Sequence, residues 1–213
     1  MIEQLSPSPV RVETELLMPL GSGFGASGAG ALSSAYALNQ AFGLGLTANG
    51  VGAAAHVAEV VSGTGLGDVI AQNTGGLVVR LFPGAPGLGV VDRIPVPPQK
   101  VDCLVRGPLS TEKVLSDPGT MKEVNREGEL ALKELLKRPT LERFVSLSWE
   151  FAKRSGLARG WMEDAVEAVE ASGGMAGMVM LGDAIFALNG GEALAEFGEV
   201  ISARVSLGGA GLE

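Results

Sequence analysis

The sequence predicts an α+β fold in two parts, and three observations support this prediction. A glycine-rich loop at 21–30 leads into an apolar, alanine-rich segment with the composition of a helix. Two runs rich in β-branched and leucine residues, 76–82 and 88–94, flank a proline- and glycine-containing turn, which is typical of a β-hairpin. Amphipathic segments between 120 and 172 are then followed by further apolar runs, so a second group of helices and strands is expected.

The first part is expected to contain an exposed strand, two longer helices, a short helix and the hairpin. Alternation of polar and apolar residues over 10–15 predicts the strand. One helix follows the glycine-rich loop and ends near Phe42, and a second is predicted over 51–61. After a second glycine-rich turn, Asp68 is the expected N-cap of a short helix that runs through Gln72.

The proline-rich segment 95–98 predicts a stiff connector between two domains, which we place at 1–98 and 99–213. The expected elements of the second domain are, in order, a strand at 100–106, helices near 120–136, 141–155 and 161–172, a glycine- and methionine-rich loop at 172–178, and a strand, a helix and a strand that ends at 207.

Composition narrows the class of protein. The chain has 213 residues, enough for one large or two small domains, and a net charge of −8, which argues against a nucleic-acid surface or an anionic-membrane binder. No stretch reaches the about 18 apolar residues of a spanning helix, and the start lacks the pattern of a signal peptide. Cys103 is the only cysteine and lies in an apolar run, so we expect a buried, unreactive thiol and a cytoplasmic location.

The glycine-rich loop is the strongest chemical signal in the chain. Five glycines and four other small residues lie between Gly21 and Gly30. Glycine adopts positive φ easily, and the free N–H groups and dipole of the following helix favour an anion, so a nucleotide phosphate is the expected ligand. The alternative is an ordinary flexible loop, because glycine and alanine are frequent throughout the chain. The loop lacks the Lys-Ser/Thr ending of a Walker motif, and no buried parallel strand precedes it.

Four polar residues form a second candidate group: His56, Glu59, Asp68 and Arg80. His56 and Glu59 are three residues apart on a predicted helix and therefore share a face. Taken singly, each has a structural explanation: a packing histidine, a solvated glutamate, a helix cap and an outward strand residue. Together they indicate a site, because His56 is the only histidine and Arg80 interrupts an apolar run where a cation has no evident structural use.

The pattern Pro-x-x-x-Gly-x-Gly-x-Ser that begins at Pro19 resembles the second motif of the GHMP kinase superfamily. Further segments extend the resemblance to the archaeal pantoate kinase family over nearly the whole chain. These segments are 23–33, 55–59, 63–69, 75–80 and 173–182, the last of which occupies the position of the superfamily's third motif, which lies against the phosphate loop.

The resemblance implies a GHMP-kinase fold, with an incomplete ribosomal S5 domain 2-like N-terminal part and a ferredoxin-like C-terminal domain. It also implies transfer of the γ-phosphoryl group of ATP to the 4-hydroxyl of pantoate in archaeal coenzyme A biosynthesis, with Mg²⁺ as the metal. Ser27 and Glu59 would hold Mg²⁺, Asp68 would accept the hydroxyl proton, and His56 and Arg80 would hold pantoate. The loop residues implied to contact the phosphates are Gly21, Gly23, Gly25, Ala26, Ser27 and Gly28.

The chain departs from the family because roughly the first quarter of a member, with its first motif, is not recognisable before the loop. A misassigned start, a separately encoded N-terminal segment and a remnant without catalysis are the three interpretations. We therefore expect the chain alone to be inactive, and either to self-associate, for example as a homodimer, or to need the preceding segment. Another small-molecule kinase of homoserine or mevalonate type and a non-catalytic nucleotide-binding subunit are the alternative functions.

Overall fold

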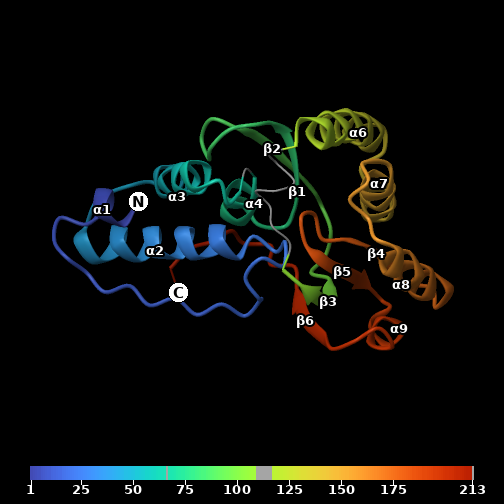
Figure 1. The fold of residues 1–213 in the computed structure, drawn as a ribbon. Coiled ribbons are helices and arrows are strands. Elements are labelled where there is room, and N and C mark those ends of the chain that lie inside the picture. The colour runs from blue at the N-terminus through green and yellow to red at the C-terminus, as the bar shows by residue number, and fades with distance from the viewer. Residues whose placement is uncertain (66, 109–116, 213) are drawn as a thin grey trace. The chain divides into compact units, whose positions relative to one another are not determined.

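The computed structural model describes residues 1–65, 67–108 and 117–212, and the chain divides into two compact units (Figure 1). The chain passes from one unit to the other after Pro95, inside the proline-rich connector. Each unit also includes a short segment from the other side of this crossing: Pro19–Phe24 belongs to the second unit and Ser206–Glu213 to the first. The division into domains 1–98 and 99–213 therefore stays a prediction. The first unit contains Met1–Met18, Gly25–Pro95 and Ser206–Glu213, and the second contains Pro19–Phe24 and Val96–Val205.

The first unit is built on helices whose small and apolar faces meet. These helices are α1 (Ile2–Leu5), α2 (Ala26–Phe42), α3 (Ala48–Ser62) and α4 (Asp68–Thr74). Leu32 and Ala35 of α2 pack with Val51 and Ala55 of α3 and with Val69 of α4, and none of these five side chains is more than 1% exposed. The core of this unit therefore joins the three helices that carry most of the predicted site residues.

Capping residues explain where α2 and α3 end and where α3 begins. Gly43 and Gly63 take left-handed conformations at the C-caps, with φ of +58° and +65°, as glycine does most easily. The Thr47 side chain accepts a hydrogen bond from Gly50 N and caps the start of α3. Leu66, part of the predicted glycine-rich turn after α3, lies outside the described residues.

The predicted hairpin is confirmed. Strand β1 (Leu77–Phe82) pairs antiparallel with β2 (Val90–Ile94), with Arg80 opposite Val91. The C-terminal segment lies alongside this hairpin and α4. Gly76 N donates to Ser206 O at 2.7 Å, and the carbonyl oxygen of Gln72 accepts from the backbone N–H of Ala210 at 2.8 Å.

The second unit has a four-stranded antiparallel sheet with the order β4-β5-β3-β6. Its elements are β3 (Lys100–Gly107), α6 (Pro118–Lys137), α7 (Leu141–Arg154), α8 (Gly160–Ala171), β4 (Met175–Met178), β5 (Asp183–Leu188), α9 (Gly191–Ala195) and β6 (Val200–Arg204). Along the chain, a strand is followed by a helical crossover, two strands, a helix and a last strand. Together with the strand order in the sheet, this succession is the ferredoxin-like arrangement, as predicted.

One face of this sheet carries the core of the second unit. Val166 and Val169 of α8 pack with Leu104 of β3 and Ile185 of β5. Cys103 is 2% exposed, and burial raises the pKa of its thiol to about 11, which agrees with the predicted unreactive role.

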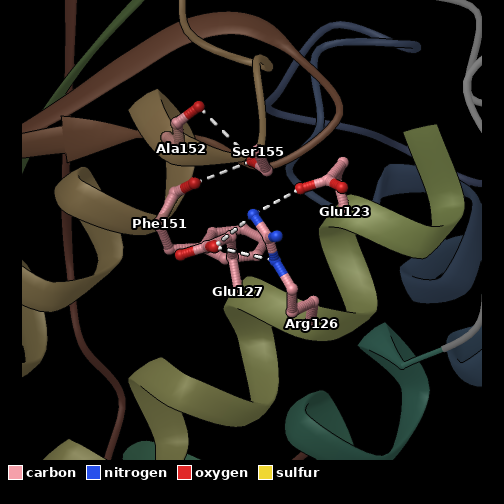
Figure 2. Close-up of polar contacts among 6 residues, drawn as sticks. All are labelled: Glu123, Arg126, Glu127, Phe151, Ala152 and Ser155. Carbon is pink, nitrogen blue, oxygen red and sulfur yellow. Dashed lines mark hydrogen bonds and ion pairs between the residues drawn. The ribbon is translucent and has the colours of Figure 1, made fainter. Parts of the chain in front are cut away.

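Helix α6 carries a small ionic cluster near the end of α7, drawn in Figure 2. The Arg126 guanidinium donates to Glu127 at 2.9 Å and pairs with Glu123 at 2.6 Å, while Glu127 itself is only 7% exposed. Ser155, at the C-cap of α7, donates to the carbonyl oxygen of Phe151 at 2.7 Å. Every charge in this cluster has a partner, so it is a structural feature.

Three predicted features are wrong. Residues 10–15 form no strand, because none of the described strands pairs with them and alternation alone does not stabilise an extended segment. Met175–Met178, predicted as part of a loop, is strand β4, because β5 supplies it with a hydrogen-bonding partner. Asp68 is the first residue of α4, and Gly67 occupies the N-cap. Among the described residues, the Asp68 carboxyl therefore makes no capping hydrogen bond to the start of α4.

Candidate active site

Glu59 is the centre of the polar cluster in the first unit. It lies on α3, is only 4% exposed, and its carboxylate accepts hydrogen bonds from two hydroxyls. Ser27 Oγ on the first turn of α2 lies 2.8 Å from Oε2 and 2.9 Å from Oε1, and Thr64 Oγ1 lies 2.8 Å from Oε1. These two hydroxyls hold the Glu59 carboxylate in place between α2 and the turn that follows α3.

A second carboxylate, that of Asp68, faces the same space. Gly65 separates the two acids so closely that a Cβ atom there would lie 2.6 Å from Glu59 Oε2 and 3.2 Å from Asp68 Oδ2. Burial of the carboxyl raises the pKa of Asp68, and the negative charge of Glu59 raises it further. The Asp68 residue as a whole is nevertheless exposed to solvent. Such an acid is suited to exchange a proton with a bound hydroxyl group.

Arg80 supplies the positive charge of the cluster. It lies on β1, and its guanidinium packs onto Gly67 so closely that any Cβ atom at that position would overlap it. The charge of Arg80 acts on Asp68 in the opposite direction to burial and Glu59, because it lowers the pKa of that carboxyl. Because positions 65 and 67 are glycines, the carboxylates of Glu59 and Asp68 and the guanidinium of Arg80 can lie close to this turn. This explains why the turn is glycine-rich.

The start of α2 and the start of α4 also lie in close contact. Gly25 is the N-cap of α2 with φ of +66°, and no side chain caps this end of the helix. A Cβ atom at Gly25 would lie 2.8 Å from Asp68 Cβ, and one at Gly28 would lie 3.4 Å from Gln72 Oε1. Gln72 Nε2 donates to the carbonyl oxygen of Gly25 at 3.0 Å. The small residues of the loop are therefore needed for helix packing as well as for any ligand.

The structure assigns His56 a less direct place. It lies on α3 one turn before Glu59 and is half-buried, and no hydrogen bond links it to another residue in the described part of the chain. The contacts that bring Ser27, Glu59, Asp68 and Arg80 together do not include it. Its predicted role in holding a substrate stays a prediction.

The predicted phosphate-contacting residues are divided between the two units. Gly25, Ala26, Ser27 and Gly28 belong to the first unit, where they form the start of α2. Gly21 and Gly23 belong to the second unit and have positive φ.

In the second unit, Gly23 packs against the turn between β4 and β5. A Cβ atom at Gly23 would lie 2.8 Å from Met180 O and from Gly182 N, and one at Gly182 would overlap the backbone of Ser22. The late glycine segment thus contacts this part of the loop, as the family resemblance implies for the third motif.

The donor set of the cluster fits a hard cation of the Mg²⁺ type. Such an ion usually takes one or two carboxylates and completes its shell with water and phosphate oxygens. Glu59 with the hydroxyl of Ser27 matches this requirement, since the carboxylate is buried and its described partners are hydroxyls. Groups of three or more potential metal-ligating His, Cys, Asp or Glu residues are absent from the described ranges, so the ion would depend on its phosphate ligands.

Two residues that contact the cluster or its helices, Thr64 and Gln72, are not predicted as site residues from the sequence. Thr64 lies in the glycine-rich turn, five residues after Glu59, and a hydroxyl at this spacing behind a buried acid could have suggested the contact. Gln72 was assigned only as the end of a short helix. No sequence signal predicts its bond to Gly25, because that contact joins residues 47 positions apart.

Comparison with family models and with curated proteins identifies similar sequences. Residues 1–76 match the model of the GHMP kinases N-terminal domain. The chain is 42% identical over 191 residues to a pantoate kinase of Thermococcus kodakarensis, an alignment that covers 87% of this chain and 63% of that protein. It is 40% identical over 176 residues to a pantoate kinase of Methanocaldococcus jannaschii, covering 83% of this chain and 63% of the relative. The chain thus spans less than two thirds of the length of these relatives.

Solved structures that resemble this chain are also small-molecule kinases or a related phosphotransferase. A phosphotransferase related to the coenzyme A biosynthesis pathway superimposes with a TM-score of 0.76 at 37% identity, over 92% of this chain and 66% of that one. A homoserine kinase from Cytophaga hutchinsonii gives 0.67 at 19% identity, over 91% and 69% of the two chains. A mevalonate kinase of L. major, solved with R-mevalonate, gives 0.60 at 20% identity, over 87% and 67%. The last two similarities establish the fold alone.

Proposed function

Since this chain belongs to the GHMP kinase superfamily, we propose that it catalyses, with any further segment of its natural protein, ATP-dependent phosphorylation of the 4-hydroxyl of pantoate. The product would be 4-phosphopantoate, an intermediate for coenzyme A biosynthesis in the cytoplasm. The proposal rests on the pantoate kinases that the chain matches at 42% and 40% identity and on the chemistry of the polar cluster.

The cluster of Ser27, Glu59, Asp68 and Arg80 is the observation that carries the proposal. Phosphoryl transfer needs positioning of the reactants and neutralisation of phosphate charge more than covalent participation of the protein. Glu59 and Ser27 would hold Mg²⁺, which would supply positive charge to offset the charge of the phosphates. The hydroxyl bonds from Ser27 and Thr64 fix the Glu59 carboxylate in one orientation for this purpose.

Asp68 would orient the attacking hydroxyl and accept its proton. Its carboxyl faces the same space as Glu59, and its raised pKa makes it a stronger base than an ordinary exposed aspartate. Its position at the start of α4, directly against Gly25, places it beside the first turn of α2. Proton acceptor and phosphate-binding backbone therefore belong to one compact group of residues.

Substrate recognition would depend on Arg80 and His56. Pantoate carries a carboxylate, and the guanidinium fork of an arginine binds a carboxylate with two parallel hydrogen bonds. Because the protein is acidic, with a net charge of −8, an anionic substrate needs such a dedicated cation. His56, one turn from Glu59, would provide a further polar contact.

ATP phosphates would be held by the loop and by the start of α2. Gly21, Gly23 and Gly25 all have positive φ, and Ala26, Ser27 and Gly28 begin a helix whose N-terminus no side chain caps. Backbone N–H groups at an uncapped helix start favour a phosphate.

Two alternatives make different predictions. A homoserine- or mevalonate-type kinase would share the fold, but the similarity to those enzymes is below 25% identity and supports nothing further. A non-catalytic subunit would have no use for a proton acceptor and a substrate cation together, so the joint presence of Asp68 and Arg80 in one cluster favours an enzyme.

An assay of ADP release distinguishes these functions. The 213-residue chain and the product of its longest natural reading frame are each incubated with ATP, Mg²⁺ and pantoate, homoserine or mevalonate. We expect turnover with pantoate from at least one of the two preparations, and loss of it in Asp68→Asn. Turnover with another acceptor, or none with any acceptor despite ATP binding, would contradict the proposal.

A further inference from the structure

The side chain of Gln72 links the helix that carries Asp68 to the first turn of α2. Its Nε2 donates to the Gly25 carbonyl oxygen at 3.0 Å, and the same oxygen accepts the first helical bond of α2 from Ala29 N at 2.9 Å. Gly25 has a left-handed conformation, with φ of +66°. Gln72 therefore holds the residue at which the loop turns into the helix.

The other end of this amide is unusual. Gln72 Oε1 is buried and has no hydrogen-bond partner, and it is the one buried side-chain nitrogen or oxygen of which this holds in the described ranges. Turning the amide over would place Oε1 against the Gly25 carbonyl, so that two acceptors would face each other. Buried polar atoms are almost always satisfied, and an exception marks a place where another requirement prevails.

Asp68 and Gln72 lie on the same face of α4, since they are four residues apart. Both contact the same glycine: a Cβ atom at Gly25 would lie 2.8 Å from Asp68 Cβ and 2.8 Å from Gln72 Nε2. The bond from Gln72 thereby sets the distance between the start of α2 and the carboxyl of Asp68.

We infer that Gln72 is a positioning residue for phosphoryl transfer: it holds the Gly25 turn in register with Asp68, at the expense of an unsatisfied amide oxygen. The inference rests on the proposed function, because it assigns phosphate binding to the start of α2 and proton acceptance to Asp68. A displacement of about 1 Å between such groups can lower a rate about 10²-fold, so one hydrogen bond at this point is decisive for catalysis.

The chain provides a matched control. Tyr36 OH donates to Asn73 Oδ1 at 2.9 Å and also joins α2 to α4, but it is nine residues beyond Ser27 along α2. Tyr36→Phe removes a bond between the same two helices without touching the Gly25 turn. A purely structural role of Gln72 predicts similar consequences for the two variants.

The test compares Gln72→Met with Tyr36→Phe in whichever preparation has activity. We expect Gln72→Met to lower kcat about 10-fold or more with a KM for pantoate within about twofold of the parent, and Tyr36→Phe to keep both constants within about twofold. Thermal unfolding of both variants should be shifted to a similar extent. Equal kcat values for the two variants would overturn the inference.

Gln72→Glu keeps the shape of the side chain and decides the matter if Gln72→Met does not fold. Its carboxylate cannot donate to Gly25, so kcat should fall as well. A parental kcat in Gln72→Glu would contradict the inference.

Calorimetric binding of a non-hydrolysable ATP analogue with Mg²⁺ separates this inference from the proposed function. Gln72→Met should bind the analogue at least about threefold more weakly than Tyr36→Phe, because the Gly25 turn is less well held. Binding by the parent without turnover on pantoate would contradict the proposed function and leave the Gln72 inference to be decided by this ratio. No binding by the parent would overturn both.

Discussion

Two aspartates, one in each unit, show how differently the same side chain is used. Asp102 lies on β3 of the second unit, is 4% exposed, and accepts hydrogen bonds from Lys100 Nζ at 3.0 Å and from Ser202 Oγ at 2.5 Å. Burial acts to raise its pKa, but the hydrogen bonds from Lys100 and Ser202 and the charge of Lys100 outweigh that effect and hold the pKa below its ordinary value. Asp68 in the first unit has a raised pKa.

The difference lies in the partners. Asp102 has a cation and a hydroxyl for its oxygens, so its charge is neutralised, and the bond from Ser202 links β3 to β6. Asp68 faces a second carboxylate, Glu59, while Arg80 offsets only part of the combined effect of burial and repulsion. Neutralisation by a cation and a hydroxyl, as at Asp102, is what a structural acid needs, whereas two carboxylates held close together, as Asp68 and Glu59 are, is the arrangement expected of the proposed proton-transfer site.

Neutralising Asp68 should have the largest effect on activity, because Asp68 is the proposed proton acceptor. We expect Asp68→Asn to lower kcat roughly 10²-fold or more, because general-base assistance is of about that size. Binding of an ATP analogue should change little. Steady-state kinetics with pantoate measure the first effect, and calorimetry the second. Turnover close to that of the parent would remove Asp68 from the mechanism.

Arg80 gives the next largest expected effect. Its loss in Arg80→Ala should raise the KM for pantoate about 10- to 150-fold, which corresponds to about 1.5–3 kcal/mol for a charged, two-pronged contact. The KM for ATP should change much less. Arg93→Ala is the matched control, since Arg93 lies on the paired strand β2 and donates to the carbonyl oxygen of Leu207 at 3.2 Å. Equal increases in both KM values would indicate that Arg80 is structural.

Asp102 should affect stability alone. Asp102→Asn loses the charged acceptor of Lys100 and Ser202, which is expected to lower the free energy of unfolding at pH 7 by about 1–3 kcal/mol. Because the folded-state pKa is depressed, this contribution is present above the ordinary pKa of 3.8 and is lost as the pH falls through the folded value. The difference from the parent, measured by urea unfolding, should therefore shrink in acid. A fall in kcat at unchanged folding would contradict the division of roles.

Periodicity predicted the helices of the second unit well. The segments 120–136, 141–155 and 161–172 correspond to α6, α7 and α8 with ends that differ by at most two residues. Their apolar residues recur at helical spacing, so the core face can be inferred without knowing the partner. The hairpin β1–β2 was predicted on the same basis, from two β-rich runs around a turn.

Elements whose stability depends on a distant partner could not be predicted. Met175–Met178 has the composition of a loop and becomes strand β4 only because Leu188 and its neighbours pair with it. The predicted strand at 10–15 has no partner among the described strands.

The same limit applies to the candidate site. The residues Ser27, Glu59, Asp68 and Arg80 were identified from their types and from family resemblance, but the hydrogen bonds of Thr64 and Gln72 depend on how three helices pack. Glycine composition indicated a loop able to approach a ligand, and the structure adds that Gly65 and Gly67 are needed to let charged side chains converge.

A single titration tests the contrast between the two aspartates most directly. The carboxyl carbons of selectively labelled aspartates can be followed by ¹³C NMR as a function of pH, with assignments from Asp68→Asn and Asp102→Asn. We expect Asp68 to titrate above the ordinary value of 3.8 and Asp102 below it, and we expect Glu59→Gln to lower the pKa of Asp68 while leaving that of Asp102 unchanged. Titration of Asp68 at or below 3.8, or no response to Glu59→Gln, would contradict the claim that the first unit holds its acids poised for proton transfer.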